Sequence, residues 1–185
     1  MTKDVVDLIM DDHREVERLF DRMKKDAGSR ALLLPALSTL LIAHSRAEES
    51  EVYPVARVEA HEESKVAHSQ EEHAQAERLL VRLQSIDPLS NAFDTTLDEL
   101  VDAVTHHVEE EESSVLPGLR SQLTAERGQQ LASAFTESRA LHFGDRPGEA
   151  TKEELVTAAR NEGITGASNM SKQELAEQIQ PEDDS

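Results

Sequence analysis

Residues 44–54 read HSRAEESEVYP, and residues 107–117 read HVEEEESSVLP. In both stretches a histidine is followed by a glutamate four residues later and by a proline ten residues later, which gives the pairs His44–Glu48 and His107–Glu111. Side chains four residues apart on a helix lie on one face, one turn from each other, so each pair can hold the same metal centre. The two stretches therefore predict two helices that contribute equivalent halves of one site.

A lone histidine precedes each of these stretches in a matching context. The two contexts are DDHREVERLF, which contains His13, and EEHAQAERLL, which contains His73. The histidines and glutamates fall on the apolar stripes of their segments, where burial without partners would cost on the order of several kcal/mol per group. Divalent or trivalent metal ions would remove that cost. The candidate metal ligands are therefore His13, His44, Glu48, His73, His107 and Glu111.

The remaining histidines lack this pattern. His106 and Glu110 have the same four-residue spacing but lie off the apolar stripe, so Glu111 is expected to be the one ligand in its acidic run, among solvated neighbours. The others have no counterpart in the other half of the chain and are predicted to be surface residues, namely His61, His68 and His142. The sequence has neither the Glu-x-x-His motif of ferritin-like carboxylate bundles nor the His-Glu-x-x-His motif of zinc proteases.

Apolar residues recur with helical periodicity to residue 141, which predicts an all-α protein. The expected helices cover about residues 3–25, a stretch ending near 53, a stretch ending at 86, residues 92–116, and a covering helix at 125–141. The second helix begins either near Ser29 or at Pro35, because proline suits a first helical turn but would kink an interior. Four long helices with short connections are typical of an antiparallel up-down-up-down four-helix bundle.

The chain divides into four expected segments, which are the bundle at 1–141, a linker at 142–150, a small helix-turn-helix module at 151–180 and a disordered tail at 181–185. The module is predicted from two capping boxes, Thr151 with Glu154 and Ser171 with Glu174. It is expected to move relative to the bundle and to contribute no metal ligands.

The composition excludes several kinds of site and partner. The 185 residues contain no cysteine, so thiolate metal sites and cysteine nucleophiles are excluded. With 19 basic against 38 acidic residues, the formal charge of −19 should repel nucleic acid and anionic membranes. The lack of a signal peptide or long apolar segment predicts a cytoplasmic protein with no membrane partner.

The candidate ligands, together with Pro54 and Pro117, make residues 1–141 resemble the hemerythrin-like family of HHE cation-binding domains. The resemblance implies an antiparallel four-helix bundle with a non-haem di-iron centre. The ligands it implies are His13 and His44 for one iron, His73 and His107 for the other, and Glu48 and Glu111 as bridges. An oxo or hydroxo group would complete the bridge between the two irons.

The chain departs from the oxygen-carrying hemerythrins that it resembles, because their third helix supplies a His-x-x-x-His pair. Here His73 is followed four residues later by Glu77, which is a candidate for an additional ligand. Tyr53 is another candidate, since some relatives carry a tyrosine there. Regular helical phase turns Tyr53 away from Glu48, although Pro54 can distort that turn.

Two functions follow from the resemblance. The four-histidine pattern resembles members linked to peroxide and nitric oxide handling, so we expect a di-iron protein that binds or reacts with H2O2, O2 or NO. Catalase-like turnover would be its enzymatic form, and no catalytic residue is identified. The alternative is an iron or redox sensor whose metal-dependent folding is read by a protein partner through the C-terminal module. That module resembles SAP-like and Rho N-terminal-like modules, but its acidic residues argue against nucleic-acid binding.

Overall fold

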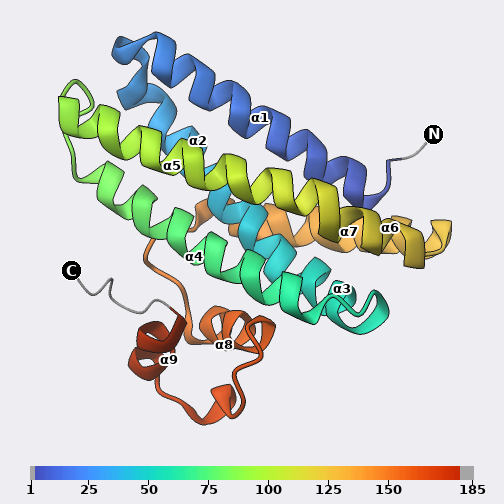
Figure 1. Cartoon of the computed structure of the whole chain (residues 1–185). Coiled ribbons are helices and arrows are strands. Elements are labelled where there is room, and N and C mark those ends of the chain that lie inside the picture. The colour runs from blue at the N-terminus through green and yellow to red at the C-terminus, as the bar shows by residue number, and fades with distance from the viewer. Residues whose placement is uncertain (1–2, 180–185) are drawn as a thin grey trace.

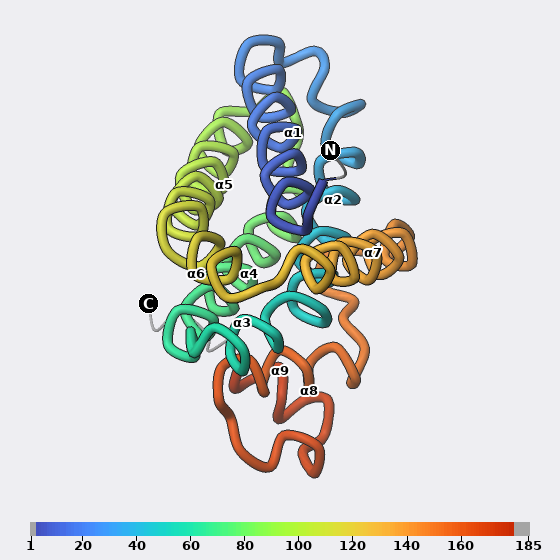
Figure 2. The backbone as a smooth tube through the Cα atoms, turned by 90° about the vertical axis from the view of Figure 1, so that its right-hand side faces the viewer, coloured from blue at the N-terminus to red at the C-terminus, as the bar shows by residue number. Residues whose placement is uncertain are grey.

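The computed structural model describes residues 3–179, and that part of the chain is helical, without β-strands. The four long helices are α1 (Val5–Lys25), α2 (Arg30–Ala47), α4 (Glu63–Gln84) and α5 (Asn91–Glu110). They run alternately in opposite directions (Figure 1), and Figure 2 shows them arranged around a common interior. α1 packs on α2 and α5, and α4 packs on the same two helices. The predicted all-α helical bundle is confirmed.

Local signals in the sequence set the helix starts. Asp4 caps α1 by accepting a hydrogen bond from the backbone N–H of Asp7, whose side chain accepts one from the backbone of Asp4 in return. α2 begins at Arg30, the earlier of the two predicted starts, so Pro35 lies inside the helix. The carbonyl of Ala31 thereby loses its helical donor, but Ala31 is exposed and water can replace the donor.

Both helices with an inner His-Glu pair continue beyond the prolines that were expected to end them. After α2 the chain forms a π-helical segment, η2 (Glu48–Val52), and then α3 (Tyr53–Glu59). After α5 it forms the equivalent segment η3 (Glu111–Val115) and then α6 (Leu116–Gln122). The wider π turn makes room for a proline ring that would clash with the carbonyl four residues earlier in a regular α-helix. The predicted helix ends near residues 53 and 116 are therefore wrong.

The apolar side chains of the bundle form two clusters with the candidate ligands between them. One cluster fills the end that contains the α1–α2 and α4–α5 connections and includes Val16 and Leu83. The other fills the opposite end and includes Ile9 and Phe135. On α1, His13 falls between Ile9 of one cluster and Val16 of the other. Polar groups in this layer are shielded from water, so they need partners within the protein or bound ions.

Helix α7 (Ala125–Leu141) covers α1 and α2 beside this layer. Thr124 caps its first turn by accepting a hydrogen bond from the backbone N–H of Arg127. Phe135 is fully buried, and its ring meets that of His44 edge-on with centroids 5.9 Å apart. The covering helix has the bounds that the sequence predicts.

The C-terminal module consists of α8 (Lys152–Asn161) and α9 (Lys172–Ile179). Both predicted capping boxes are formed, at Thr151 with Glu154 and at Ser171 with Glu174. Residue 180 and the predicted tail at 181–185 lie outside the described residues.

The module sits on the bundle, with α8 against α4 and η2. Leu155 and Leu175 of the module share an apolar cluster with Ala74 of α4. The side chain of Asn161, 2% exposed, donates hydrogen bonds to the backbone carbonyl of Glu49 at 2.9 Å and to Oε1 of Gln70 at 3.0 Å. These contacts do not agree with the expectation that the module moves independently. Two short helices cannot bury their apolar faces alone, so they use the bundle.

One helical stretch, Ala27–Glu59, is long and apolar enough to cross a membrane by length and composition, and 50% of its apolar window is buried within the protein. The expectation of no long apolar segment is therefore too strict. A core helix of a bundle meets the same criteria, and this stretch carries the buried His44 and Glu48 in its interior.

Candidate metal centre

The structure brings the six predicted ligands together in the layer between the two apolar clusters. None of them is more than 7% exposed. The histidines form two pairs, His13 of α1 with His44 of α2 and His73 of α4 with His107 of α5. The ring centroids lie 5.1 Å apart in the first pair and 4.7 Å apart in the second. Each pair therefore bridges two neighbouring helices of the bundle.

Each predicted glutamate ligand lies between the two histidine pairs. The distances from glutamate Oε2 to histidine Nε2 are 3.1 Å for Glu48–His44, 3.4 Å for Glu48–His73, 3.4 Å for Glu111–His13 and 3.9 Å for Glu111–His107. Each carboxylate thus contacts one histidine of each pair. This is the position from which one carboxylate could serve ions at both pairs.

Each of the four histidines points its Nε2 atom into the cluster. Its Nδ1 atom contacts a carboxylate outside the six candidate ligands, which we call an outer carboxylate. The distances from Nδ1 to the carboxylate oxygen are 2.8 Å for His13–Glu112, 3.2 Å for His44–Asp12, 3.1 Å for His73–Glu49 and 2.9 Å for His107–Glu72. An outer carboxylate of this kind fixes the orientation of the ring and makes imidazole a stronger metal ligand. The arrangement is what a histidine-bound metal requires of its surroundings.

These outer carboxylates were missed in the sequence. Each is next to a candidate ligand in the sequence but contacts a histidine of another helix. For example, Asp12 directly precedes His13 and contacts His44. The signal that could have revealed them is the repetition of acidic residues directly beside the ligands. Glu112, which follows Glu111, contacts His13 and is not merely a solvated neighbour, so that expectation is wrong.

Several polar atoms of the cluster are buried without a hydrogen-bond partner. They are Nε2 of His13, Nε2 of His44, and both carboxylate oxygens of Glu48 and of Glu111. Leaving such an atom unpaired costs about 1–3 kcal/mol, so orphaned groups are rare in folded proteins. A bound metal would satisfy them, and imidazole nitrogens with carboxylate oxygens suit iron and related transition ions. The residues present therefore fit a metal centre.

The charges around the cluster determine which groups hold protons in the metal-free chain. Burial lowers the pKa of His44, but the charge of Glu48 and the hydrogen bond to Asp12 outweigh it and raise the pKa to about 10. For His73, burial is outweighed by the neighbouring carboxylates of Glu48 and Glu49, which raise the pKa to about 9. Burial disfavours the charge of Glu48, yet the neighbouring His44 holds the pKa of that carboxyl well below its usual value. Metal ions and protons therefore compete for these histidines.

Tyr53, a candidate additional ligand, points into the cluster. Its side chain is fully buried, its hydroxyl lies 3.1 Å from Nε2 of His73, and its ring stacks on that imidazole with centroids 5.4 Å apart. The π turn places Tyr53 five residues after Glu48 on the same side of the helix, although regular helical phase would turn it away. Burial and the charges of Glu111 and Glu48 raise the pKa of the Tyr53 hydroxyl well above its usual value.

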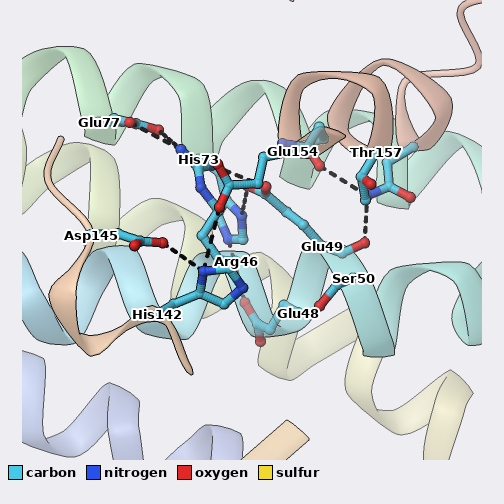
Figure 3. A network of polar contacts seen from close by, with 12 residues as sticks. Arg46, Glu48, Glu49, Ser50, His73, Glu77, His142, Asp145, Glu154 and Thr157 are labelled. Atoms are coloured by element: carbon cyan, nitrogen blue, oxygen red, sulfur yellow. Dashed lines mark hydrogen bonds and ion pairs between the residues drawn. The ribbon is translucent and has the colours of Figure 1, made fainter. Parts of the chain in front are cut away.

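Glu77, the other candidate, lies outside the cluster. Its carboxylate accepts hydrogen bonds from the guanidinium of Arg46 at 2.8 and 3.1 Å and from the backbone N–H of Gly148 at 2.8 Å. Arg46 also pairs with Glu49 at 3.1 Å, and Figure 3 shows this network extending to His73. Glu77 therefore fixes the linker to the bundle and does not occupy the position of a ligand.

A cavity of about 20 Å³ adjoins the four histidines. Apolar side chains form part of its wall, including Val16, Leu41 and Val104. A volume of this size holds about one water-sized molecule. The cluster therefore has room for one small ligand in largely apolar surroundings.

The sequence of this chain is similar to those of known proteins. The family pattern of the Hemerythrin HHE cation binding domain matches residues 4–119. Over 149 residues the chain is 28% identical to a DNA nickase of Nostoc sp.. The matched region covers 80% of this chain but only 42% of the nickase. Over 139 residues it is 28% identical to an uncharacterised hemerythrin-like protein of Schizosaccharomyces pombe. This matched region covers 73% of this chain and 68% of the relative. No solved structure gives a significant match.

Proposed function

We propose that this chain, which belongs to the hemerythrin HHE cation-binding domain family, holds two non-haem iron ions and there binds or reacts with a small oxidant. H2O2 is the leading ligand in this proposal, and O2 and NO are the alternatives. Metal binding follows from the family and from the buried histidine and glutamate donors. The number of ions, their identity as iron and the oxidant are the proposed part.

One observation carries the proposal of two ions. Two overlapping groups of side chains have the spacing to hold a metal ion. They are His13, His44 and Glu48 in one group and Glu48, His73 and His107 in the other. Within each group the ligand atoms lie within 4.8 Å of one another. The groups share Glu48, and Glu111 also contacts one histidine of each pair. Two neighbouring ions that share carboxylates would use every inward-facing donor of the layer.

The protein would hold the ions, orient their ligands and exclude bulk water. The carboxylates at the four Nδ1 atoms keep each ring in place and keep Nε2 available for the ion. Bound iron would supply redox chemistry. The small apolar cavity beside the four histidines would admit only small molecules. The hydroxyl of Tyr53, 3.1 Å from Nε2 of His73, would offer a further polar group to the centre.

Metal analysis with a stopped-flow peroxide assay tests the proposal. Protein produced with ample iron should contain two irons per chain and absorb in the near ultraviolet through an oxo-to-iron transition. Addition of H2O2 should change this absorption. The iron-loaded protein should consume peroxide faster than a metal-free sample does. A single bound zinc, or no metal after production with ample iron, would overturn the di-iron centre.

A sensor is the second candidate, and one contact favours it. Asn161 of the module donates a hydrogen bond to the backbone carbonyl of Glu49, whose side chain holds Nδ1 of His73. A change at the ligands would therefore reach α8 through one residue. In a sensor, iron would stabilise the fold and a protein partner would read the state of the module.

Protease sensitivity of the metal-free and iron-loaded forms separates the two functions. Rapid loss of peroxide, together with a metal-free bundle that resists protease, supports the reactive protein. Slow loss of peroxide, together with a metal-free form that is readily digested, supports the sensor.

The Nostoc relative is named a DNA nickase, but we do not propose DNA cleavage for this chain. The formal charge of −19 opposes contact with the phosphate backbone. We propose a cytoplasmic protein with no nucleic-acid or membrane partner. A band shift of duplex DNA at about 150 mM salt, where exposed charges are largely screened, would contradict this.

A further inference from the structure

A second set of histidines and carboxylates meets on the surface of the bundle, across the contact between α4 and α5. His68 and Glu72 of α4, and His106 and Glu110 of α5, repeat the His-x-x-x-Glu spacing of the inner ligands. On each helix this spacing places both side chains on one face. The structure turns those two faces toward each other, and one ligand atom from each residue lies within 4.8 Å of the others.

The four side chains are spaced as ligands around a single ion. Nε2 of His68 lies 3.6 Å from Oε1 of Glu72 and 3.4 Å from Oε2 of Glu110. Nε2 of His106 lies 3.8 Å from Oε1 of Glu72 and 3.4 Å from Oε1 of Glu110. A tetrahedral ion with bonds of about 2.0–2.2 Å separates its ligands by about 3.3–3.6 Å. The observed distances therefore leave space for one such ion between the four groups.

Glu72 distinguishes this group from an ordinary cluster of surface charges. Its side chain is only 9% exposed, and Oε2 is held by Nδ1 of His107 at 2.9 Å. The other oxygen, Oε1, faces His68 and His106 and is buried without a hydrogen-bond partner. An unpaired buried carboxylate oxygen is unfavourable. A cation between the two histidines would satisfy it.

We propose that His68, Glu72, His106 and Glu110 form a second metal site, which binds one divalent transition ion such as Zn2+. Two imidazoles and two carboxylates suit Zn2+ and its neighbours in the first transition row. Mg2+ and Ca2+ favour all-oxygen sites. The site is open to solvent, since the side chains of His68 and His106 are 51% and 62% exposed.

The outer site would communicate with the inner centre through Glu72, which offers one oxygen to each. An ion at Oε1 would draw charge away from Oε2 and so weaken its hold on Nδ1 of His107. This consequence rests on the proposed di-iron function, whereas the outer site does not.

A third group, His142 with Asp145 and Glu154, is a weaker candidate. A carboxylate oxygen of Asp145 already lies 2.6 Å from Nδ1 of His142. The carboxylate of Glu154 accepts a hydrogen bond from the backbone N–H of Thr151 in a capping box. No side-chain atom of this group is buried without a partner in the part of the chain that the structure describes. His142 therefore serves as the control position.

Calorimetric titration of the iron-loaded protein with Zn2+ tests the outer site. Wild-type protein should bind one Zn2+ per chain in addition to its iron. His68→Ala and His106→Ala should each weaken that binding at least about tenfold, as the loss of a metal-site residue does. His142→Ala should bind like the wild type. Circular dichroism checks that each variant remains helical. No saturable binding by the wild type, or unchanged binding in both His68→Ala and His106→Ala, overturns the site.

Iron content of the same samples separates this proposal from the inner centre. If the protein holds no iron, wild type should still bind one more Zn2+ than the double variant His68→Ala/His106→Ala, and equal stoichiometry would overturn the outer site. In iron-loaded wild type, Zn2+ should also shift the near-ultraviolet absorption, and in His106→Ala it should not. Zinc binding without such a shift would overturn the communication through Glu72.

Discussion

The hydroxyl of Tyr53 lies 3.1 Å from Nε2 of His73, inside the ligand layer of the bundle. At the equivalent position of the other half, directly before Pro117, the chain has Leu116. Its buried side chain can neither donate nor accept a hydrogen bond. The two histidine pairs are otherwise closely matched. The phenol therefore makes the His73–His107 side of the cluster chemically different from the side of His13 and His44.

Replacing Tyr53 by phenylalanine tests whether the phenol binds iron. Tyr53 is the single tyrosine of the chain, so a visible phenolate-to-iron absorption band can have no other origin. We expect the iron-loaded wild type to show this band and Tyr53→Phe to lose it while retaining two irons. Phenylalanine preserves the ring packing, so the free energy of unfolding should change by only about 0.5–1.5 kcal/mol. A wild type without the band would limit Tyr53 to hydrogen bonding.

Replacing Glu112 by glutamine should weaken iron binding about 10- to 100-fold, as loss of the partner of a ligating histidine typically does. The reason is its carboxylate, which holds Nδ1 of His13 at 2.8 Å. Glu109→Gln is the matched control, because Glu109 belongs to the same acidic run and is exposed. Competition with a chelator measures both affinities. Equal losses in the two variants would attribute the effect to net charge and not to the contact with His13.

Two adjacent histidines provide a test of the helical phase. His107 is 7% exposed within the ligand layer, whereas the side chain of His106 is 62% exposed on the surface. His107→Ala should lose most of the bound iron, and His106→Ala should keep it. Iron content after desalting is the measurement. The reverse result would mean that the wrong face of α5 has been assigned to the inner centre.

Asn161 should govern the attachment of the module. Asn161→Ala leaves the carbonyl of Glu49 and the side chain of Gln70 without their donor, which should weaken docking by about 1–3 kcal/mol. Hydrogen exchange of the α8 backbone should become correspondingly faster. Asn169→Ala is the control, since Asn169 is an exposed asparagine of the same module. Unchanged exchange in Asn161→Ala would show that the apolar contacts alone hold the module.

Docking of the module should also depend on pH. Burial, with the charges of Glu71 and Glu49, raises the pKa of Glu162 from 4.5 to about 7. The folded protein therefore binds this proton more tightly than the unfolded chain, so docking should weaken as the pH rises from 4.5 to about 7 and change little above that. Hydrogen exchange of α8 between about pH 5 and 8 measures this. Glu162→Gln should flatten the dependence, and a variant that retains it would assign it to another group.

The helical fold and the candidate ligands could be predicted because both depend on spacing within single segments. A period of 3.6 residues identifies the helices, and the interval from His44 to Glu48 places both side chains on one face whatever surrounds the helix. Capping boxes such as that of Thr151 are equally local. The structure gathers the six residues that these intervals selected, and their role as metal ligands stays a prediction.

Tertiary structure alone decided the surroundings of those ligands. Glu72 meets His107 and His106 only because α4 and α5 pack with particular faces together. The π turn brings Tyr53 into the layer although regular helical phase excludes it. Which faces meet is set by packing among residues far apart in the chain. Local periodicity therefore identifies what each helix offers, and the packing of the helices determines which of those groups touch.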